Sequence, residues 1–307
     1  MKSYLPLLAL LGVATAQTQY TSTASAAVAA ARATALTLSP TSSVAGTKFD
    51  RFVQIWLENT DYSKAIANAD LAYLASRGIS LTNYFAITHP SQPNYVAAVG
   101  ASTNGITDDG FRRIGSSVKT IVDLLEAKGV SWSIYQEDMP YSGFEADWKN
   151  SAGSTDYVRK HNPLMSYDSV TSDLNRLAKC KNLTMFNKDL AANKLPQWMF
   201  ITPNMTNDGH DSSISVAGKW ARNFLTPLLT NSNFNTARTL VHLTFDEGST
   251  TGTNQIYSVL LGGAVPSSKV GTTNNTRYNH YSLTKTVELN WGLGNLGQND
   301  VSAAAFF

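Results

Sequence analysis

The chain has 307 residues, of which 43% are hydrophobic and 15% are charged, and its formal net charge is +2. A chain of this length and hydrophobic content can bury a sizeable core in one large domain or two small ones. The small net charge indicates neither a basic stripe nor an acidic tail, which argues against nucleic acid as a partner.

The first sixteen residues have the pattern of a secretory signal peptide. Lys2 precedes an apolar run at residues 5–13, and small residues follow at 14–16. The apolar run is far shorter than the roughly 20 residues of a membrane-spanning helix, so we expect no stable membrane anchor. The sequence therefore predicts that residues 1–16 are a signal peptide and that the protein is secreted, to the extracellular space or the cell wall.

Two further features concern an exported chain. Asn182, Asn204 and Asn274 each begin an Asn-x-Thr sequence, the acceptor pattern for N-glycosylation. Cys180 is the single cysteine, so we expect no internal disulfide. Its charged and polar neighbours predict that it lies at an exposed helix end. We expect a glycoprotein whose stability comes from its core and hydrogen bonds.

The remaining chain divides at about residue 48. Residues 17–47 are rich in Ala, Thr and Ser, which predicts an N-terminal arm that is either flexible or helical. Residues 48–307 are expected to form a single domain. The apolar run at residues 51–57 is typical of a buried parallel strand, and it stops at Glu58 and Asn59.

Helices and strands are then predicted in alternation. Helices are expected over residues 71–77, 118–128, 170–179, 217–229 and 282–290, and strands over 81–86, 130–135, 198–201, 239–245 and 256–261. Buried strands that alternate with helices predict an α/β fold, in which a mostly parallel sheet is sandwiched between helices.

Polar residues gather where predicted strands end. Glu58 and Asn59 follow the first strand, residues 204–210 follow the strand at 198–201, and Asp246 and Glu247 follow the strand at 239–245. Ligands of open α/β sheets bind at the carboxyl ends of the strands. Four oxygen donors from two strand ends fit a divalent cation, although turn-forming or helix-capping roles explain the same residues.

A second candidate is Ser91, within the sequence Thr-His-Pro-Ser-Gln-Pro-Asn-Tyr at residues 88–95. Two prolines restrict the backbone around Ser91, and the small residues at 96–101 allow a tightly packed helix behind it. A hydroxyl at a helix N-terminus suits a nucleophile that attacks a phosphate, and Asn94 could donate to a phosphate oxygen. The alternative is an N-terminal capping serine in a proline-rich turn.

The chain contains five histidines. His89, His161, His210 and His280 have polar, loop-like neighbours, where an imidazole can bind phosphate, donate a proton or bind a metal. An incidental surface histidine is the alternative for each of them. His242 lies within an apolar run, which predicts a hydrogen-bonded histidine in the core.

Several of these segments, taken in order, resemble one family. They are residues 55–59, 89–95, 203–211, 244–248 and 278–282. The series is similar to the secreted fungal acid phosphatases of the phosphoesterase family, which also holds bacterial acid phosphatases and phospholipases C. The resemblance runs from about Phe49 to the C-terminus. It implies an alkaline-phosphatase-like fold, since that family resembles the alkaline-phosphatase superfamily.

The resemblance also implies roles for the residues of two motifs. Ser91 matches the superfamily's nucleophile. Glu58, Asn59, Asp246 and Glu247 match its first metal site, which implies one divalent metal ion bound by these residues together with Ser91.

A third set of residues matches the superfamily's second metal site. Asn204 and His210 stand where an aspartate and a histidine bind a second zinc, and His280 matches the last histidine of that site. Since Asn204 is not anionic, we infer that the second site has lost a ligand. His210 and His280, with His161, are then expected to neutralise phosphate, which would favour acidic pH.

The function that the resemblance implies is hydrolysis of small phosphate monoesters through a phosphoserine intermediate. Two alternatives stay open. A phospholipase C acting on phosphodiesters would use the same residues, and a catalytically silent cell-wall or glycan-binding protein would have kept only the fold.

Overall fold

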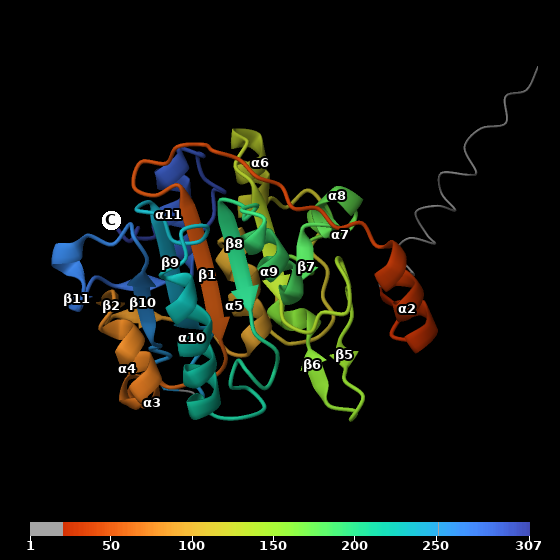
Figure 1. Cartoon of the computed structure of the whole chain (residues 1–307), viewed down its shortest axis with the longest axis horizontal. Helices are drawn as coiled ribbons and strands as arrows, with labels where there is room; N and C mark the ends of the chain where they lie inside the picture. Colours follow the sequence, from red (N-terminus) through yellow and green to blue (C-terminus); the bar gives the residue numbers. More distant parts are fainter. Residues whose placement is uncertain (1–20, 251) are drawn as a thin grey trace, which may run out of the picture.

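The computed structural model describes residues 21–250 and 252–307, so the expected signal peptide at residues 1–16 lies outside the described residues. Within the described part, no helix is long and apolar enough to cross a bilayer. A central sheet with helices on either side makes up the body (Figure 1).

The central sheet contains eight strands among the described residues. In spatial order they are β11 (Thr272–Asn274), β2 (Ile79–Leu81), β10 (Ser258–Leu261), β9 (Thr239–Phe245), β1 (Arg51–Leu57), β8 (Trp198–Thr202), β4 (Trp132–Gln136) and β7 (Cys180–Asn182). Only β10 runs against its neighbours, and all other pairs in this sheet are parallel. Short pairs form outside it, between β3 (Tyr84–Phe85) and β12 (Tyr278–Asn279) and between β5 (Trp148–Lys149) and β6 (Thr155–Tyr157).

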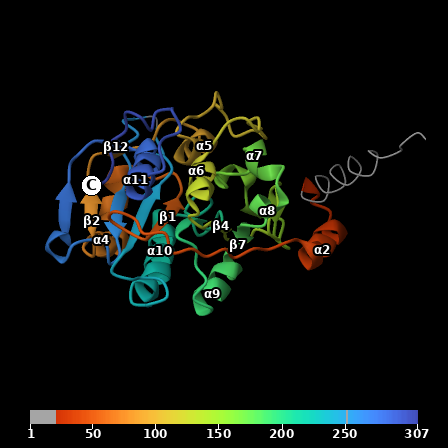
Figure 2. The ribbon, with the colours of Figure 1, turned by 90° about the horizontal axis from the view of Figure 1, so that it is seen from above.

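Helices cover both faces of the sheet (Figure 2). One face carries α5 (Ser91–Gly100), α6 (Ile121–Lys128) and α11 (Tyr281–Trp291), which pack on one another, and the other carries α4 (Ala69–Ala75), α9 (Leu183–Ala191) and α10 (Ile214–Leu228). The shorter helices are α3 (Tyr62–Ala67), α7 (Asp168–Thr171), α8 (Leu174–Leu177), η1 (Arg159–His161) and η2 (Ser267–Lys269). The mostly parallel α/β sandwich expected from the sequence is confirmed. It explains why β9 is buried along its whole length, because parallel strands have a helix layer on each face.

The N-terminal part of the described chain begins with α2 (Ser25–Thr34), which lies at one end of the body (Figure 1). The chain then runs along the body without regular structure. The Leu38 amide donates to the Ala178 carbonyl at 2.9 Å, and Ser42 Oγ donates to Gln197 Oε1 at 2.6 Å. Hydrogen bonds to two distant parts of the chain hold this segment against the domain.

Helix α5 is buried along all ten residues. Its small side chains allow close approach, as a Cβ added at Gly100 would lie 2.0 Å from the Tyr167 hydroxyl oxygen. The expected tight helix behind Ser91 is therefore present, and its first turn is fixed by packing on all sides.

Two predicted elements differ from those observed. The strand expected over 81–86 is split between β2 and β3, which belong to different sheets. The helix expected over 170–179 is interrupted, because Asp173 accepts the Asn175 and Arg176 amides at 2.8 and 3.3 Å and starts α8. Local capping and strand pairing, which a periodic pattern does not encode, decide both boundaries.

The expected exposed position of Cys180 is wrong. Cys180 is fully buried and begins β7, where it pairs with Ile134 of β4. The charges beside it misled the prediction, since Lys181 is also buried and pairs with Asp189 Oδ2 at 2.6 Å. The core position predicted for His242 is confirmed, with its Nε2 2.7 Å from Ser258 Oγ.

Candidate active site

The site is built on the carboxyl ends of β1 and β9. These strands pair in parallel register, and Leu57 lies beside Phe245. The polar residues that follow each strand therefore emerge side by side. The backbone amide of Asn59 donates to Asp246 Oδ1 at 3.1 Å, and this bond joins the ends of the two strands.

Ser91 reaches the same place from the first turn of α5. Its hydroxyl oxygen lies 3.2 Å from Glu58 Oε2, 3.4 Å from Asn59 Oδ1 and 3.1 Å from Glu247 Oε1. One hydroxyl has a single proton to donate, so it cannot serve both carboxylate oxygens at once. The side chain is 1% exposed.

The oxygen donors converge as ligands of a hard cation do. Asn59 Oδ1 lies 2.9 Å from Glu58 Oε2 and 3.2 Å from Asp246 Oδ1, and turning the amide over would place its nitrogen there as a donor to both carboxylates. Oxygen–oxygen separations of about 3.0–3.4 Å are the edges of an octahedron with cation–oxygen distances of about 2.1–2.4 Å. The donor set therefore fits a divalent cation.

The carboxyl groups of this cluster repel one another. Burial, followed by the charge of Glu247, raises the pKa of Asp246 to about 7, and burial raises the pKa of Glu247 to about 7. Burial and the charges of Asp246 and Asp208 raise the pKa of Glu58 well above its usual range. A bound cation would remove this penalty, because it favours the ionised carboxylates.

A second group of candidate ligands adjoins the first. Glu58, His161 and Asp208 are all buried, and each offers a ligand atom within 4.8 Å of the others, so this group could hold a metal ion. His161 Nε2 lies 3.2 Å from Glu58 Oε1, and His161 Nδ1 lies 3.6 Å from Asp208 Oδ2. Burial, then the charges of Lys160 and His210, lowers the pKa of His161 well below 6.5, so the imidazole is neutral and able to coordinate.

Comparison with known proteins gives a family for this arrangement. The family model described as "Phosphoesterase family" matches residues 39–294. The chain belongs to the phosphoesterase family. It is 53% identical over 271 residues to the phosphate-repressible acid phosphatase of Penicillium chrysogenum, covering 88% of this chain and 66% of that protein. It is 52% identical over 268 residues to an acid phosphatase of Aspergillus fumigatus, covering 86% of this chain and 60% of that protein.

The chain thus spans about two thirds or less of the length of these two fungal relatives. Among solved structures, a protein of the alkaline phosphatase superfamily from Vibrio parahaemolyticus superposes with a TM-score of 0.52. It is 10% identical, and the match covers 94% of this chain and 81% of that one. The predicted family and its alkaline-phosphatase-like fold are confirmed.

In this phosphoesterase, the side-chain amide of Asn204 bonds within its own loop and to Asp138, so the structure does not bring it to the carboxylate cluster. Its Oδ1 accepts the Thr206 and Asn207 amides, and its Nδ2 donates to Asp138 Oδ2 at 2.6 Å. Asp208, four residues further on, is the buried carboxylate of this loop that could bind a metal ion. A four-residue shift within one loop is invisible in a sequence pattern, because the loop's turns decide which side chain points inward.

The phosphate contact expected for Asn94 does not fit the phosphoesterase structure. Its Oδ1 accepts the amides of Ile87 and Thr88 at 2.9 and 3.2 Å. Its Nδ2 donates to the carbonyls of Thr88 and Pro90 at 2.8 and 3.3 Å. Both ends of the amide are used by the backbone, so Asn94 fixes the loop that leads to Ser91.

The cationic role expected for His280 is also contradicted. Burial lowers the pKa of His280 to about 3, so its ring is neutral. Its Nε2 lies 2.6 Å from the Asp246 carbonyl oxygen, and its Nδ1 lies 3.3 Å from the Tyr84 hydroxyl. His280 therefore stabilises the backbone at the end of β9 through the Asp246 carbonyl. His210 lies nearer the surface, with its Nδ1 2.7 Å from Asp211 Oδ1 and its ring 5.8 Å from that of His161.

Two residues that contact the site carboxylates had no specific role predicted from the sequence: His89 was one of four candidate histidines, and Tyr95 was not a candidate. His89 Nδ1 lies 2.6 Å from Glu247 Oε2, and the Tyr95 hydroxyl donates to Glu58 Oε1 at 2.5 Å. His89 could have been singled out, because it stands two residues before Ser91. Tyr95 could have been found from its position four residues after Ser91 on the same helix, which places both on one face.

The three candidate glycosylation residues lie on separate parts of the surface layer. Asn182 precedes α9, where its Oδ1 accepts the Thr184 amide at 2.7 Å and its Nδ2 donates to the Met139 carbonyl at 2.5 Å. Asn274 ends β11, and its Nδ2 donates to the Tyr278 hydroxyl at 3.0 Å. Asn204 lies on the loop that carries Asp208.

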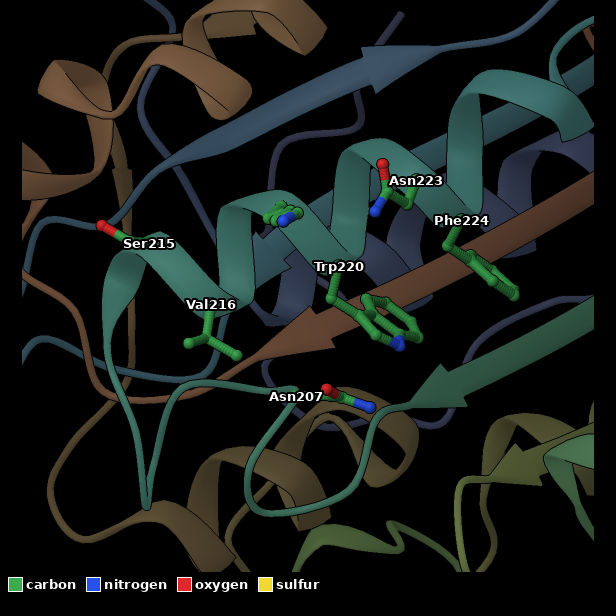
Figure 3. A pocket seen from close by; sticks show the side chains of 7 residues that line it. Asn207, Ser215, Val216, Trp220, Asn223 and Phe224 are labelled. Atoms are coloured by element: carbon green, nitrogen blue, oxygen red, sulfur yellow. The ribbon is translucent and has the colours of Figure 1, made fainter.

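A groove lies beside this loop, along the outer side of α10 (Figure 3). It encloses about 610 Å³ and is lined by Asn207, Ser215, Val216, Lys219, Trp220, Asn223 and Phe224. The rings of Trp220 and Phe224 stack with centroids 4.8 Å apart. One lining residue, Asn207, immediately precedes Asp208 in the chain.

Proposed function

We propose that this phosphoesterase is an acid phosphatase that hydrolyses small phosphate monoesters, with Ser91 as the nucleophile. The observation that carries the proposal is the Ser91 hydroxyl, held at the N-terminus of α5 within 3.4 Å of three oxygen atoms from the ends of β1 and β9. The names of the fungal relatives support the substrate class.

In this proposal, Glu58, Asn59, Asp246 and Glu247 hold one divalent cation together with Ser91. The cation would lower the pKa of the serine hydroxyl and offset charge on the phosphate. The positive end of α5 also favours the phosphate. Nucleophilic attack forms the Ser91 Oγ–phosphorus bond and breaks the bond to the leaving oxygen, and water later cleaves the phosphoserine to release inorganic phosphate.

Proton movements fall to groups around Ser91. The serine proton passes to Glu247 Oε1, 3.1 Å away, while His89 holds the other oxygen of that carboxylate. His210, on the loop that carries Asp208 and close to the surface, is the proposed donor to the leaving oxygen. His161 and His280 are neutral, so they position other groups and carry no charge for phosphate.

We further propose that the enzyme is secreted and carries N-glycans. The signal-peptide pattern at residues 1–16 and the three acceptor asparagines support this. Mass spectrometry of protein recovered from the culture medium tests both points, because the first residue should be Gln17 and glycosidase treatment should lower the mass.

The test of the function is a phosphate-release assay with glycerol phosphate at acidic pH. Ser91→Ala should abolish turnover, whereas Ser133→Ala, which alters a buried serine of β4, should not. The folded state of each variant is checked by circular dichroism. Turnover by folded Ser91→Ala would show that another group is the nucleophile.

A phosphodiester substrate with an apolar leaving group is the second candidate, and the groove of α10 favours it. Rates on phosphatidylcholine and on glycerol phosphate separate the two candidates. If the groove binds acyl chains, Trp220→Ala should lower the rate on the lipid and leave the rate on glycerol phosphate unchanged.

A further inference from the structure

A carboxylate connects the nucleophile helix to a lysine. Asp109 Oδ1 accepts the backbone amide of Gln92 at 2.9 Å, and Asp109 Oδ2 accepts from Lys160 Nζ at 2.8 Å. Gln92 immediately follows Ser91. Lys160 Nζ therefore lies within about 8 Å of the first amide after the nucleophile, given two hydrogen bonds and the width of a carboxylate.

The loop that carries Asp109 is hydrogen-bonded to the first turn of α5. Gln92 is 1% exposed, and its Nε2 donates to the carbonyls of Asp108 and Gly110 at 3.1 and 2.9 Å. These bonds lie on either side of Asp109 and fix where its carboxylate points. The position of Asp109 is thus set by hydrogen bonds to the first turn of α5.

The backbone of Lys160 is held near the site by its place in the chain. It belongs to η1 and immediately precedes His161, whose ring lies between Glu58 and Asp208. Lys160 is thus tied to the site both through the backbone of η1 and through Asp109.

The ammonium group of Lys160 has N–H donors that can bind a ligand. Lysine has three N–H donors, and Asp109 takes one of them. Nearby Arg159 is committed elsewhere, because its Nη2 donates to the Arg112 and Met165 carbonyls. The side chain of Lys160 is 18% exposed, so part of it remains accessible to solvent.

We propose that Lys160 binds the phosphate group of the substrate and that Asp109 is a positioning residue that holds the ammonium group beside the first turn of α5. The proposal rests on the proposed phosphatase function. It assigns the charge-neutralising role, expected from the sequence for histidines, to a lysine ammonium group.

The test measures binding of inorganic phosphate to the metal-loaded protein by calorimetry, together with metal content and kcat/KM. Lys160→Met should weaken phosphate binding by about tenfold or more and leave the metal content unchanged. Lys160→Arg should restore part of the affinity. Lys179→Met is the matched control, because Lys179 forms a similar pair with Glu126 at 2.6 Å and is 15% exposed.

The role of Asp109 is tested by a double-mutant cycle. Asp109→Asn keeps an oxygen for the Gln92 amide and removes the charge that holds Lys160, so it should weaken phosphate binding several-fold. Adding it to Lys160→Met should then cause little further loss. An independent, purely structural role would give additive losses and would overturn the positioning role.

Phosphate affinity that is unchanged in Lys160→Met and in Lys160→Gln, at full metal content, would overturn the proposal for Lys160. Failure of the proposed function looks different. In that case the parent protein would bind phosphate through Lys160 and yet release none from phosphate esters.

Discussion

Asp246 provides a sharp test of the electrostatics of the site. Burial, followed by the charge of Glu247, raises the pKa of Asp246 from 3.8 to about 7. A shift of this size corresponds to about 4 kcal/mol. A carboxyl group whose pKa is raised by folding contributes its full stability below the unfolded value and loses it as the pH rises through the folded value. The cation-free protein should therefore lose up to about 4 kcal/mol of unfolding free energy between pH 4 and pH 7.

Asp246→Asn should remove most of this pH dependence. The amide keeps an oxygen that can accept the Asn59 N–H, and it carries no charge at any of these pH values. Urea denaturation in the presence of a chelator, at intervals from pH 4 to pH 7, gives the unfolding free energies of both proteins. Asp168→Asn is the control, because that carboxylate is 32% exposed and lies in an ion pair with Arg113.

Addition of a divalent cation completes the experiment. It should restore the stability of the parent protein at pH 7 and have a smaller effect on Asp246→Asn, whose metal content should also fall in elemental analysis. Equal stability of the chelated parent protein at pH 4 and pH 7 would refute the reasoning. So would a pH dependence that Asp246→Asn leaves unchanged.

Two further substitutions test other parts of the account. Asn94→Ala should lower the unfolding free energy by about 2–4 kcal/mol and reduce kcat, because four hydrogen bonds to backbone groups of the Ser91 loop are lost, and of these groups the Thr88 carbonyl keeps another donor, Asn254 Nδ2; an unchanged urea midpoint would contradict this. Burial, followed by Asp300, raises the pKa of Glu288 to about 8, so stability is lost as the pH rises through 8. Glu288→Gln should therefore raise the melting temperature at pH 9 more than at pH 5, and an equal effect at both would contradict the assignment.

The parts of the site that sequence predicts best are those encoded by strand ends. An apolar run that stops at Glu58 and another that stops at Asp246 indicate two buried strands with polar ends. Their meeting then follows from the parallel pairing of β1 with β9. The position of Ser91 can also be predicted from the sequence, because the prolines and small residues around it indicate a rigid turn that leads into a packed helix.

The parts that sequence does not predict depend on which way a loop side chain points. Asn94 and Asn204 have the residue type expected of ligand contacts, yet backbone groups use the whole amide of Asn94, and backbone amides and the Asp138 carboxylate use that of Asn204. Asp109 and Lys160 are 51 residues apart and carry no shared motif, so their pairing emerges only from the packing of two loops on α5. The burial of Cys180 was also not predicted. The neighbouring Lys181 suggested an exposed segment, but Lys181 is buried in an ion pair with Asp189.

The most direct test of the central claim is anomalous X-ray diffraction from crystals of the metal-loaded protein. The account predicts a metal peak within about 2.5 Å of Ser91 Oγ and of ligand oxygens from Glu58, Asn59, Asp246 and Glu247. A peak confined to the group of Glu58, His161 and Asp208, with Ser91 outside coordination distance, would contradict it.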